Sequence, residues 1–193
     1  RNRHCPKCQS LAKARWLEAR RRELLPVGYF HVVFTLPHIL NALALRNKRL
    51  VYDLLFACAS ETLKEFAAGG RHRMMGQPGI TAILHTWDQV LQQHPHLHCV
   101  VSGGALSFDR KKWMHSRKKF LFPVRALSKV FRGKFLAKLE ELYCKEKLSF
   151  YGQLAPLERP GAFDRLLENL RRKEWIVYSK PPFATPEKVL NYL

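Results

Sequence analysis

The chain has 193 residues, enough for one substantial hydrophobic core, and its 47% share of hydrophobic residues is that of a globular protein. Its charge is unusual, because 34 Lys and Arg residues against 15 Asp and Glu residues give a formal net charge of +19. A positive field of this size attracts polyanions, and counterion release makes phosphate backbones the natural partner. No apolar run approaches the ~20 residues that span a bilayer, so we expect no membrane partner.

The first 25 residues combine a cysteine pair with a basic helix predicted over 11–25, which Pro26 ends. Cys5 and Cys8 have the Cys-x-x-Cys spacing of half a tetrahedral zinc site, and a metal-free pair is the alternative. The five cysteines form no pattern typical of a disulfide framework, which favours an intracellular protein. Because the chain has no initiator methionine and stops within a predicted helix, we expect a fragment truncated at both ends.

Residues 26–193 predict a second unit, in which strands and helices follow one another. The strands are predicted from β-branched and aromatic runs between Gly and Pro residues, and the helices from apolar residues at helical spacing. In chain order we first expect a buried strand over 28–36 and a long helix that ends before Gly69. Strands over 79–87 and 96–102 should pair antiparallel, followed by a turn at Gly103 and Gly104 and a short strand over 105–108. Helices over 124–143 and 162–172, a strand over 174–180 and a last helix from Pro186 complete the order. This order fits an α+β fold with a central, mostly antiparallel sheet and helices packed on it.

A histidine-rich segment within the predicted strand over 96–102 carries the clearest chemical signal. Side chains two residues apart in a strand point to the same face, so His96 and His98 converge while Leu97 points the other way. His94 joins that face if the strand extends back through Pro95, which usually marks a strand start. Neutral imidazole is the commonest protein metal ligand, so the pair predicts a divalent-ion site. The alternative is a half-buried strand whose histidines bond to carbonyls or water.

A third protein ligand is usual at such a site, and the sequence leaves its identity open. The candidates are His31 on the first strand, the group His85, Asp88 and Gln89 just before the histidine strand, and, more weakly, Glu61. In a strongly basic protein a cation at this position would most naturally meet a phosphodiester, where it can polarise a phosphoryl oxygen.

Basic residues follow the histidine strand, and a tyrosine lies near the chain end. We expect DNA contacts from one aromatic and seven basic side chains: Arg110, Lys111, Lys112, Trp113, Lys118, Lys119, Lys180 and Lys188. A charge run of this kind also occurs in solvated loops without any ligand. Tyr192 is a candidate nucleophile, which Lys188 would help by favouring the phenolate, although packing alone could explain a tyrosine there.

Six segments in order carry a resemblance to a known family: RNRHCPKCQ, YFHVVFTLPH, LHTWDQ, HPHLHCVVSGG, FLFPVRALS and KPPFATPEKVLNYL. Together the segments resemble the rolling-circle insertion-sequence transposases, which belong to the two-tyrosine HUH endonuclease superfamily. The name HUH describes histidine, hydrophobic residue, histidine, matched here by His96, Leu97 and His98. The resemblance implies an HUH-type sheet, Mg²⁺ or Mn²⁺ at the histidines, and attack of Tyr192 on single-stranded DNA at transposon ends to leave a 5′-phosphotyrosine.

The same resemblance places the family's second tyrosine one helical turn after Tyr192, beyond Leu193, and makes 1–25 the tail of a zinc-binding module. It implies a protein of the bacterial cytoplasm that associates with the nucleoid. Two other readings remain open, a nucleic-acid-binding module with a zinc-ribbon remnant and no catalysis, and a metallohydrolase that uses activated water. The paired histidines and Tyr192 favour the transposase, because a pure binder needs neither.

Overall fold

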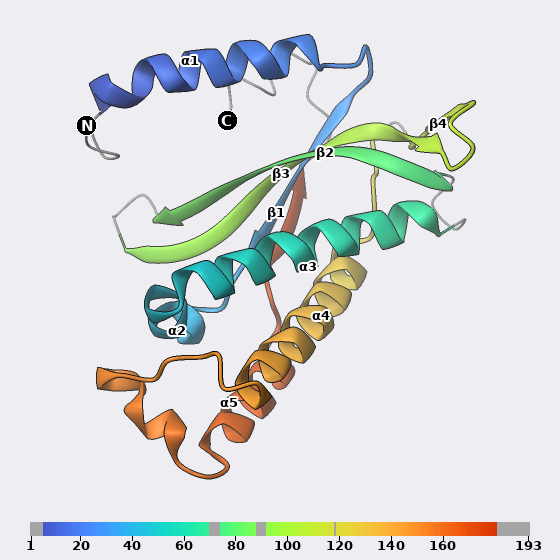
Figure 1. The fold of residues 1–193 in the computed structure, drawn as a ribbon. Helices are drawn as coiled ribbons and strands as arrows, with labels where there is room; N and C mark the ends of the chain where they lie inside the picture. The colour runs from blue at the N-terminus through green and yellow to red at the C-terminus, as the bar shows by residue number, and fades with distance from the viewer. Residues whose placement is uncertain (1–5, 70–73, 88–91, 118, 181–193) are drawn as a thin grey trace.

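The computed structural model describes residues 6–69, 74–87, 92–117 and 119–180, and their centre is a five-stranded antiparallel sheet (Figure 1). Four strands run in the order β2-β3-β1-β5, and β4 pairs with the far end of β3. The strands are β1 (Tyr29–Thr35), β2 (Gly76–Trp87), β3 (Gln93–Ser107), β4 (Trp113–His115) and β5 (Val177–Lys180). The predicted α+β class with a mostly antiparallel sheet is therefore confirmed.

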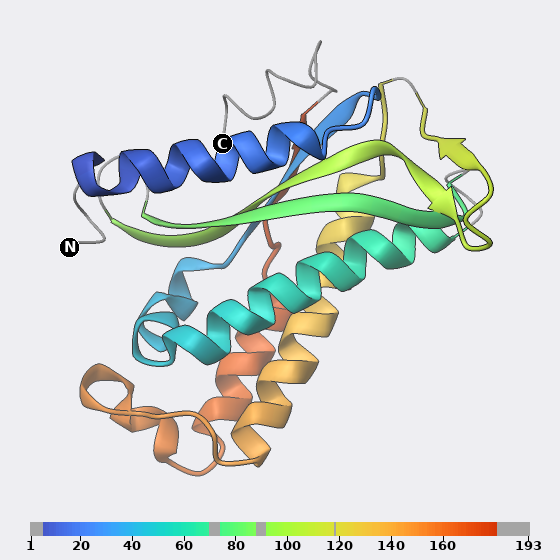
Figure 2. The same ribbon diagram turned by 45° about the horizontal axis from the view of Figure 1, so that its top comes forward.

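Helices lie on both sides of this sheet. They are α1 (Pro6–Arg22), α2 (Asn41–Arg46), α3 (Lys48–Ala68), α4 (Val124–Cys144) and α5 (Ala162–Arg172), with short 3-10 turns η1 (His38–Leu40) and η3 (Gly152–Glu158). Helix α3 covers one face, α4 crosses α3, and α5 lies beside α4, whereas α1 runs along the opposite side of the sheet (Figure 2). We call the side that faces α1 the open face.

The core forms between α3, α4 and one face of the sheet because the strands alternate. Phe34 of β1 and Leu97 of β3 are at most 1% exposed and face the helices, while their neighbours His96 and His98 face the other way and are only partly buried. Burial of one such large apolar side chain contributes about 1.5–3 kcal/mol. Alternate side chains of β3 therefore project to opposite faces, so that Leu97 packs in the core while His96 and His98 lie on the open face.

Strand β3 differs from the prediction at both ends. It begins at Gln93, so it runs through a buried Pro95, and it continues through Gly103 and Gly104 instead of turning there. A Cβ at Gly103 would lie 2.7 Å from the carbonyl oxygen of Gly28, and one at Gly104 would lie 2.5 Å from Nε1 of Trp113. These glycines thus allow close approach of neighbouring groups, and the predicted turn is wrong.

Two further differences concern short segments. Residues 105–108, expected as a separate strand, largely belong to β3. Strand β3 pairs there with β4, which lies within the basic segment for which no strand is predicted. The helical stretch after Pro37 is divided at Asn47, whose side-chain amide donates to the carbonyl oxygens of Leu43 and Ser149 and accepts from the Ser149 amide. Within the described ranges, no helix is long and apolar enough to cross a membrane.

Candidate functional site

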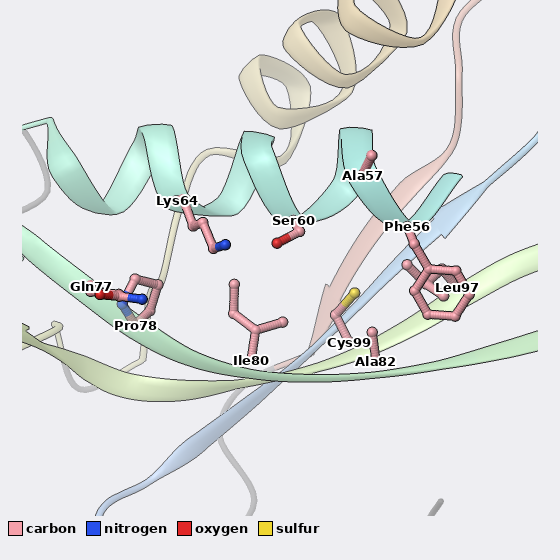
Figure 3. A pocket seen from close by; sticks show the side chains of 10 residues that line it. All are labelled: Phe56, Ala57, Ser60, Lys64, Gln77, Pro78, Ile80, Ala82, Leu97 and Cys99. Atoms are coloured by element: carbon pink, nitrogen blue, oxygen red, sulfur yellow. The ribbon is translucent and has the colours of Figure 1, made fainter. Parts of the chain in front are cut away.

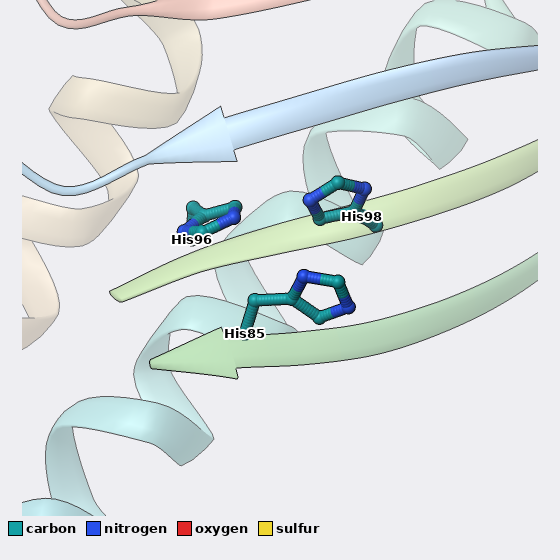
Figure 4. A group of neighbouring side chains, drawn as sticks. All are labelled: His85, His96 and His98. Carbon is teal, nitrogen blue, oxygen red and sulfur yellow. The ribbon is translucent and has the colours of Figure 1, made fainter. Parts of the chain in front are cut away.

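Three histidines from two neighbouring strands form a compact cluster on the open face (Figure 4). His85 comes from β2, and His96 and His98 come from β3. Each offers one ring nitrogen, and the three nitrogens all lie within 4.8 Å of one another. We call these residues the histidine triad.

Strand register brings His85 to the pair that the sequence identifies. His85 is the direct partner of His96, and Ile83 is the partner of His98. Directly opposite residues of an antiparallel pair project to the same face, so His85 lies on the same face as the two β3 histidines. Its ring centroid is 4.2 Å from that of His98 and 5.3 Å from that of His96.

Hydrogen bonds determine which ring nitrogen the two β3 histidines present. Nδ1 of His96 lies 2.5 Å from the carbonyl oxygen of His94, which can only accept, so Nδ1 carries the proton and Nε2 is left for another partner. Nδ1 of His98 lies 2.9 Å from Nε2 of His31, a residue of β1 that is 1% exposed. Both rings are thus held at Nδ1, which is how metal-binding histidines are commonly oriented.

The site lowers the pKa of three of its imidazoles. Burial, followed by the charges of Lys180 and His85, lowers the pKa of His31 from 6.5 to about 4. Burial, followed by neighbouring His85, His31 and His96, lowers the pKa of His98 to about 3, and burial and then His96 lower the pKa of His85. Neutral imidazole is the form that binds a metal, so these shifts favour the ligand form of His85 and His98.

These residues fit a divalent cation. A cation equidistant from three nitrogens with at most 4.8 Å between them would lie about 2.8 Å or less from each, against ~2.1 Å for a metal–imidazole bond. Small side-chain adjustments would close this difference. Three protein ligands leave further coordination positions open for a substrate oxygen.

The other candidate ligands are not members of the triad, and some lie outside the described residues. The His94 ring lies beside both His38 and His96, with centroids 4.8 and 5.2 Å away, but His94 is not in the cluster whose nitrogens converge. Glu61 is on α3, where it forms an ion pair with Lys138 at 2.5 Å. Asp88 and Gln89 fall in the segment 88–91, which the structure does not describe.

The basic residues expected to contact DNA occupy two places. Arg110, Lys111, Lys112 and Lys119 are exposed around the connection that carries β4. Trp113 is half-buried, because its ring packs on Gly104. Lys180 is exposed at the end of β5, and Lys118, Lys188 and Tyr192 lie outside the described residues.

The basic helix α1 lies on the same side of the sheet as the triad. Its final turn and the segment after it line a small pocket of about 210 Å³ together with open-face residues such as Thr81 and Val100. Leu24 packs with Tyr29 and Val100 there. Cys8 belongs to the first turn of α1, and Cys5 precedes the described residues.

A larger groove of about 540 Å³ lies on the opposite face of the sheet, between α3 and strands β2 and β3 (Figure 3). Phe56 and Lys64 of α3 face Ile80 and Cys99 of the sheet across it. Because Cys99 and His98 alternate along β3, this groove is separated from the triad by the sheet itself.

Comparison with known proteins places the chain among transposases. Residues 79–193 match the family model Y2_Tnp, described as "Putative transposase", and residues 1–36 match a transposase zinc-binding domain. The chain is 53% identical over 193 residues to "Putative transposase y4qJ" of Sinorhizobium fredii (strain NBRC 101917 / NGR234). It is 28% identical over 194 residues to "Transposase for insertion sequence element IS801" of Pseudomonas savastanoi pv. phaseolicola.

The matches cover nearly all of this chain but only 48% and 44% of those two relatives, so the chain spans about half the length of the curated relatives it matches. Among solved structures, two of the conjugative relaxase TrwC are similar, one with mutant OriT DNA and one with OriT DNA in a metal-free form. Their TM-scores are 0.45 and 0.46, with 15% and 17% identity over 72% and 74% of this chain and 53% of each relaxase chain. The family model spans more than half of the chain, and the chain therefore belongs to the Y2_Tnp family of transposases, as its sequence motifs predicted.

Proposed function

We propose that this protein is a DNA transposase that nicks single-stranded DNA at transposon ends and transfers the strand through a 5′-phosphotyrosine. The histidine triad is the observation that carries the proposal, because three imidazoles converge on one point of a basic protein. Family membership supports transposition as the biological process.

The chain's own residues would each have a defined part. His85, His96 and His98 would hold Mg²⁺ or Mn²⁺, and a cation bound there would polarise a phosphoryl oxygen and neutralise its charge. The hydrogen bond between His31 Nε2 and His98 Nδ1 would fix the orientation of the His98 ring. Basic side chains on the β4 connection and at Lys180 would bind the flanking phosphates.

Tyr192 is the proposed nucleophile. Its phenolate oxygen would attack the scissile phosphorus and form a bond to the 5′-phosphate of the downstream fragment. The bond from phosphorus to the 3′ oxygen would break at the same time, and that oxygen would take up a proton from solvent and leave as the 3′-hydroxyl of the upstream fragment. Support for this role comes from the sequence segment KPPFATPEKVLNYL, which lies within the matched range 79–193. Zinc at Cys5 and Cys8 is a separate proposal, supported by the match of residues 1–36 to a zinc-binding domain.

Metal binding can be tested independently of DNA cleavage. Titration calorimetry with MnCl₂ should show one site, and His85→Ala, His96→Ala and His98→Ala should each weaken it by at least about tenfold, because each removes one ligand. His115→Ala is the matched control, since His115 is exposed on β4 and outside the triad. Unchanged Mn²⁺ affinity in all three triad variants would contradict the metal site.

Cleavage is tested with end-labelled single-stranded DNA from a transposon end and Mn²⁺. The protein should form an adduct that survives SDS, and both Tyr192→Phe and His96→Ala should abolish it while leaving salt-sensitive DNA binding. Absence of an adduct with every divalent ion would favour the non-catalytic binding module. Cleavage that persists in Tyr192→Phe without any adduct would favour a metallohydrolase.

A further inference from the structure

Strand β5 places a second tyrosine in the same row of the open face as His98. Val33 of β1 is the direct partner of His98 on one side and of Tyr178 on the other. Directly opposite residues share a face, so these three side chains project in the same direction. Two strand spacings of ~4.8 Å separate the backbones of His98 and Tyr178 by about 10 Å.

Tyr178 presents a large aromatic surface to solvent at this position. It is 51% exposed, whereas its neighbour Val177 is 7% exposed and faces the core. Ile176, whose carbonyl oxygen accepts from the Thr35 amide, is 66% exposed. An exposed aromatic residue within reach of a candidate active site is the arrangement that binds the face of an unpaired base.

The charge around Tyr178 suits a nucleic acid. Lys180 is exposed at the end of the same strand. It is the direct partner of His31 in the register of β1 and β5, so its side chain projects to the open face beside the triad. An aromatic ring and a cation two residues apart on one strand face can contact a base and a phosphate of the same strand of DNA.

We propose that Tyr178 is a base-stacking residue, which binds the base of a nucleotide next to the scissile phosphate while Lys180 binds the backbone. This inference rests on the proposed function, because it takes single-stranded DNA at the triad as the ligand. Side chains of a sheet stand roughly perpendicular to it, so the Tyr178 hydroxyl points out beside the triad and not toward it. The face of the Tyr178 ring would therefore contact the base, and the hydroxyl would not take part.

Binding of a fluorescent single-stranded oligonucleotide, followed by anisotropy in EDTA, tests the proposal without any cleavage. Tyr178→Ala should weaken binding about 5- to 100-fold, the range that loss of one base–aromatic stack produces, and Tyr178→Phe should bind like the unchanged protein. Tyr151→Ala is the matched control, since Tyr151 is 63% exposed but follows α4 and contacts Arg46 of α2. Equal binding by Tyr178→Ala and the unchanged protein would overturn the proposal.

A scan with abasic nucleotides identifies the base. One abasic position should weaken binding to the unchanged protein, and the same position should have no further effect in Tyr178→Ala, because the stack is already lost. Effects that stay additive at every position would contradict the assignment. Loss of the covalent adduct in Tyr178→Phe with retained binding would also overturn it, since the hydroxyl would then be the functional group.

The two proposals can fail separately. An oligonucleotide that depends on Tyr178 for binding but forms no adduct with Mn²⁺ would contradict the transposase chemistry and leave the stacking role intact. An adduct that forms equally well with Tyr178→Ala, at unchanged DNA affinity, would contradict the stacking role alone.

Discussion

Acidification should lower the free energy of unfolding of the metal-free protein, and the proton that the unfolded chain binds at His31 should account for a measurable part of this decrease. The folded state lowers the pKa of His31 from 6.5 to about 4, chiefly because the side chain is buried. Between these two values the unfolded chain binds a proton at His31 and the folded protein does not. The free energy of unfolding therefore falls as the pH falls through this window, and it is highest above about pH 6.5.

The magnitude follows from the two pKa values. Between about pH 7 and pH 5, proton linkage at this one residue lowers the free energy of unfolding by about 2 kcal/mol. This is a large share of the about 5–15 kcal/mol that stabilises a typical domain. With a urea m-value of about 2 kcal/mol/M, the unfolding midpoint should move by about 1 M.

Urea unfolding in EDTA at both pH values measures this effect in the unchanged protein and in His31→Gln. Glutamine does not titrate, and its side-chain amide can both donate and accept, so it can still form a hydrogen bond with Nδ1 of His98. The variant should lose about 2 kcal/mol less than the unchanged protein on acidification. His115→Gln, an exposed position, should behave like the unchanged protein. Equal pH dependence in the unchanged protein and in His31→Gln would refute the assignment to His31.

Three further predictions concern the fold and the charge. Asn47→Ala should lower the free energy of unfolding by about 1–3 kcal/mol in urea titrations, because it leaves the backbone amide and carbonyl of Ser149 without their partner. The Leu43 carbonyl still accepts from the backbone amide of residue 47. A loss below ~0.5 kcal/mol would contradict this role. Gly104→Ala should lower the free energy of unfolding by about 1–3 kcal/mol and shift the tryptophan fluorescence, because the new Cβ would lie 2.5 Å from Nε1 of Trp113. An unchanged fluorescence spectrum and an unchanged urea midpoint would contradict this packing. The association constant for single-stranded DNA should fall as the salt concentration rises, and a plot of its logarithm against the logarithm of the salt concentration should have a slope of about −3.5 if five phosphates are contacted. An association constant that does not change with salt would show that phosphate contacts do not dominate binding.

The sequence predicts most elements of the sheet and the long helices because their hydrophobic patterns are local. The strand predicted over 28–36 is observed as β1, and the helix predicted over 124–143 is observed as α4. Strand β3 is longer than predicted, because Gly103 and Gly104 are read as turn residues when only the sequence is known. Their true role depends on Gly28 and Trp113, which are distant in sequence.

The candidate site is predictable in part for the same reason. The alternation of His96 and His98 is visible in the sequence. His85 is only one of several candidates for the third member of the triad there, because the choice depends on the register between β2 and β3. A shift of this register by one residue would turn His85 to the other face and remove it from the triad. The bond between His31 and His98 likewise needs the pairing of β1 with β3, and no local signal predicts it.

Strand position also determines how firmly each histidine is held. His96 and His98 belong to β3, which is paired on both sides, by β1 and by β2, and their neighbour Leu97 is 1% exposed in the core. His85 belongs to β2, which pairs with β3 alone among the strands of the described sheet and has a register irregularity between His85 and Trp87. Strands at a sheet edge open more readily than central strands. His85 is therefore the ligand whose position depends most on local stability, so changes that loosen β2 should weaken metal binding before they affect the core.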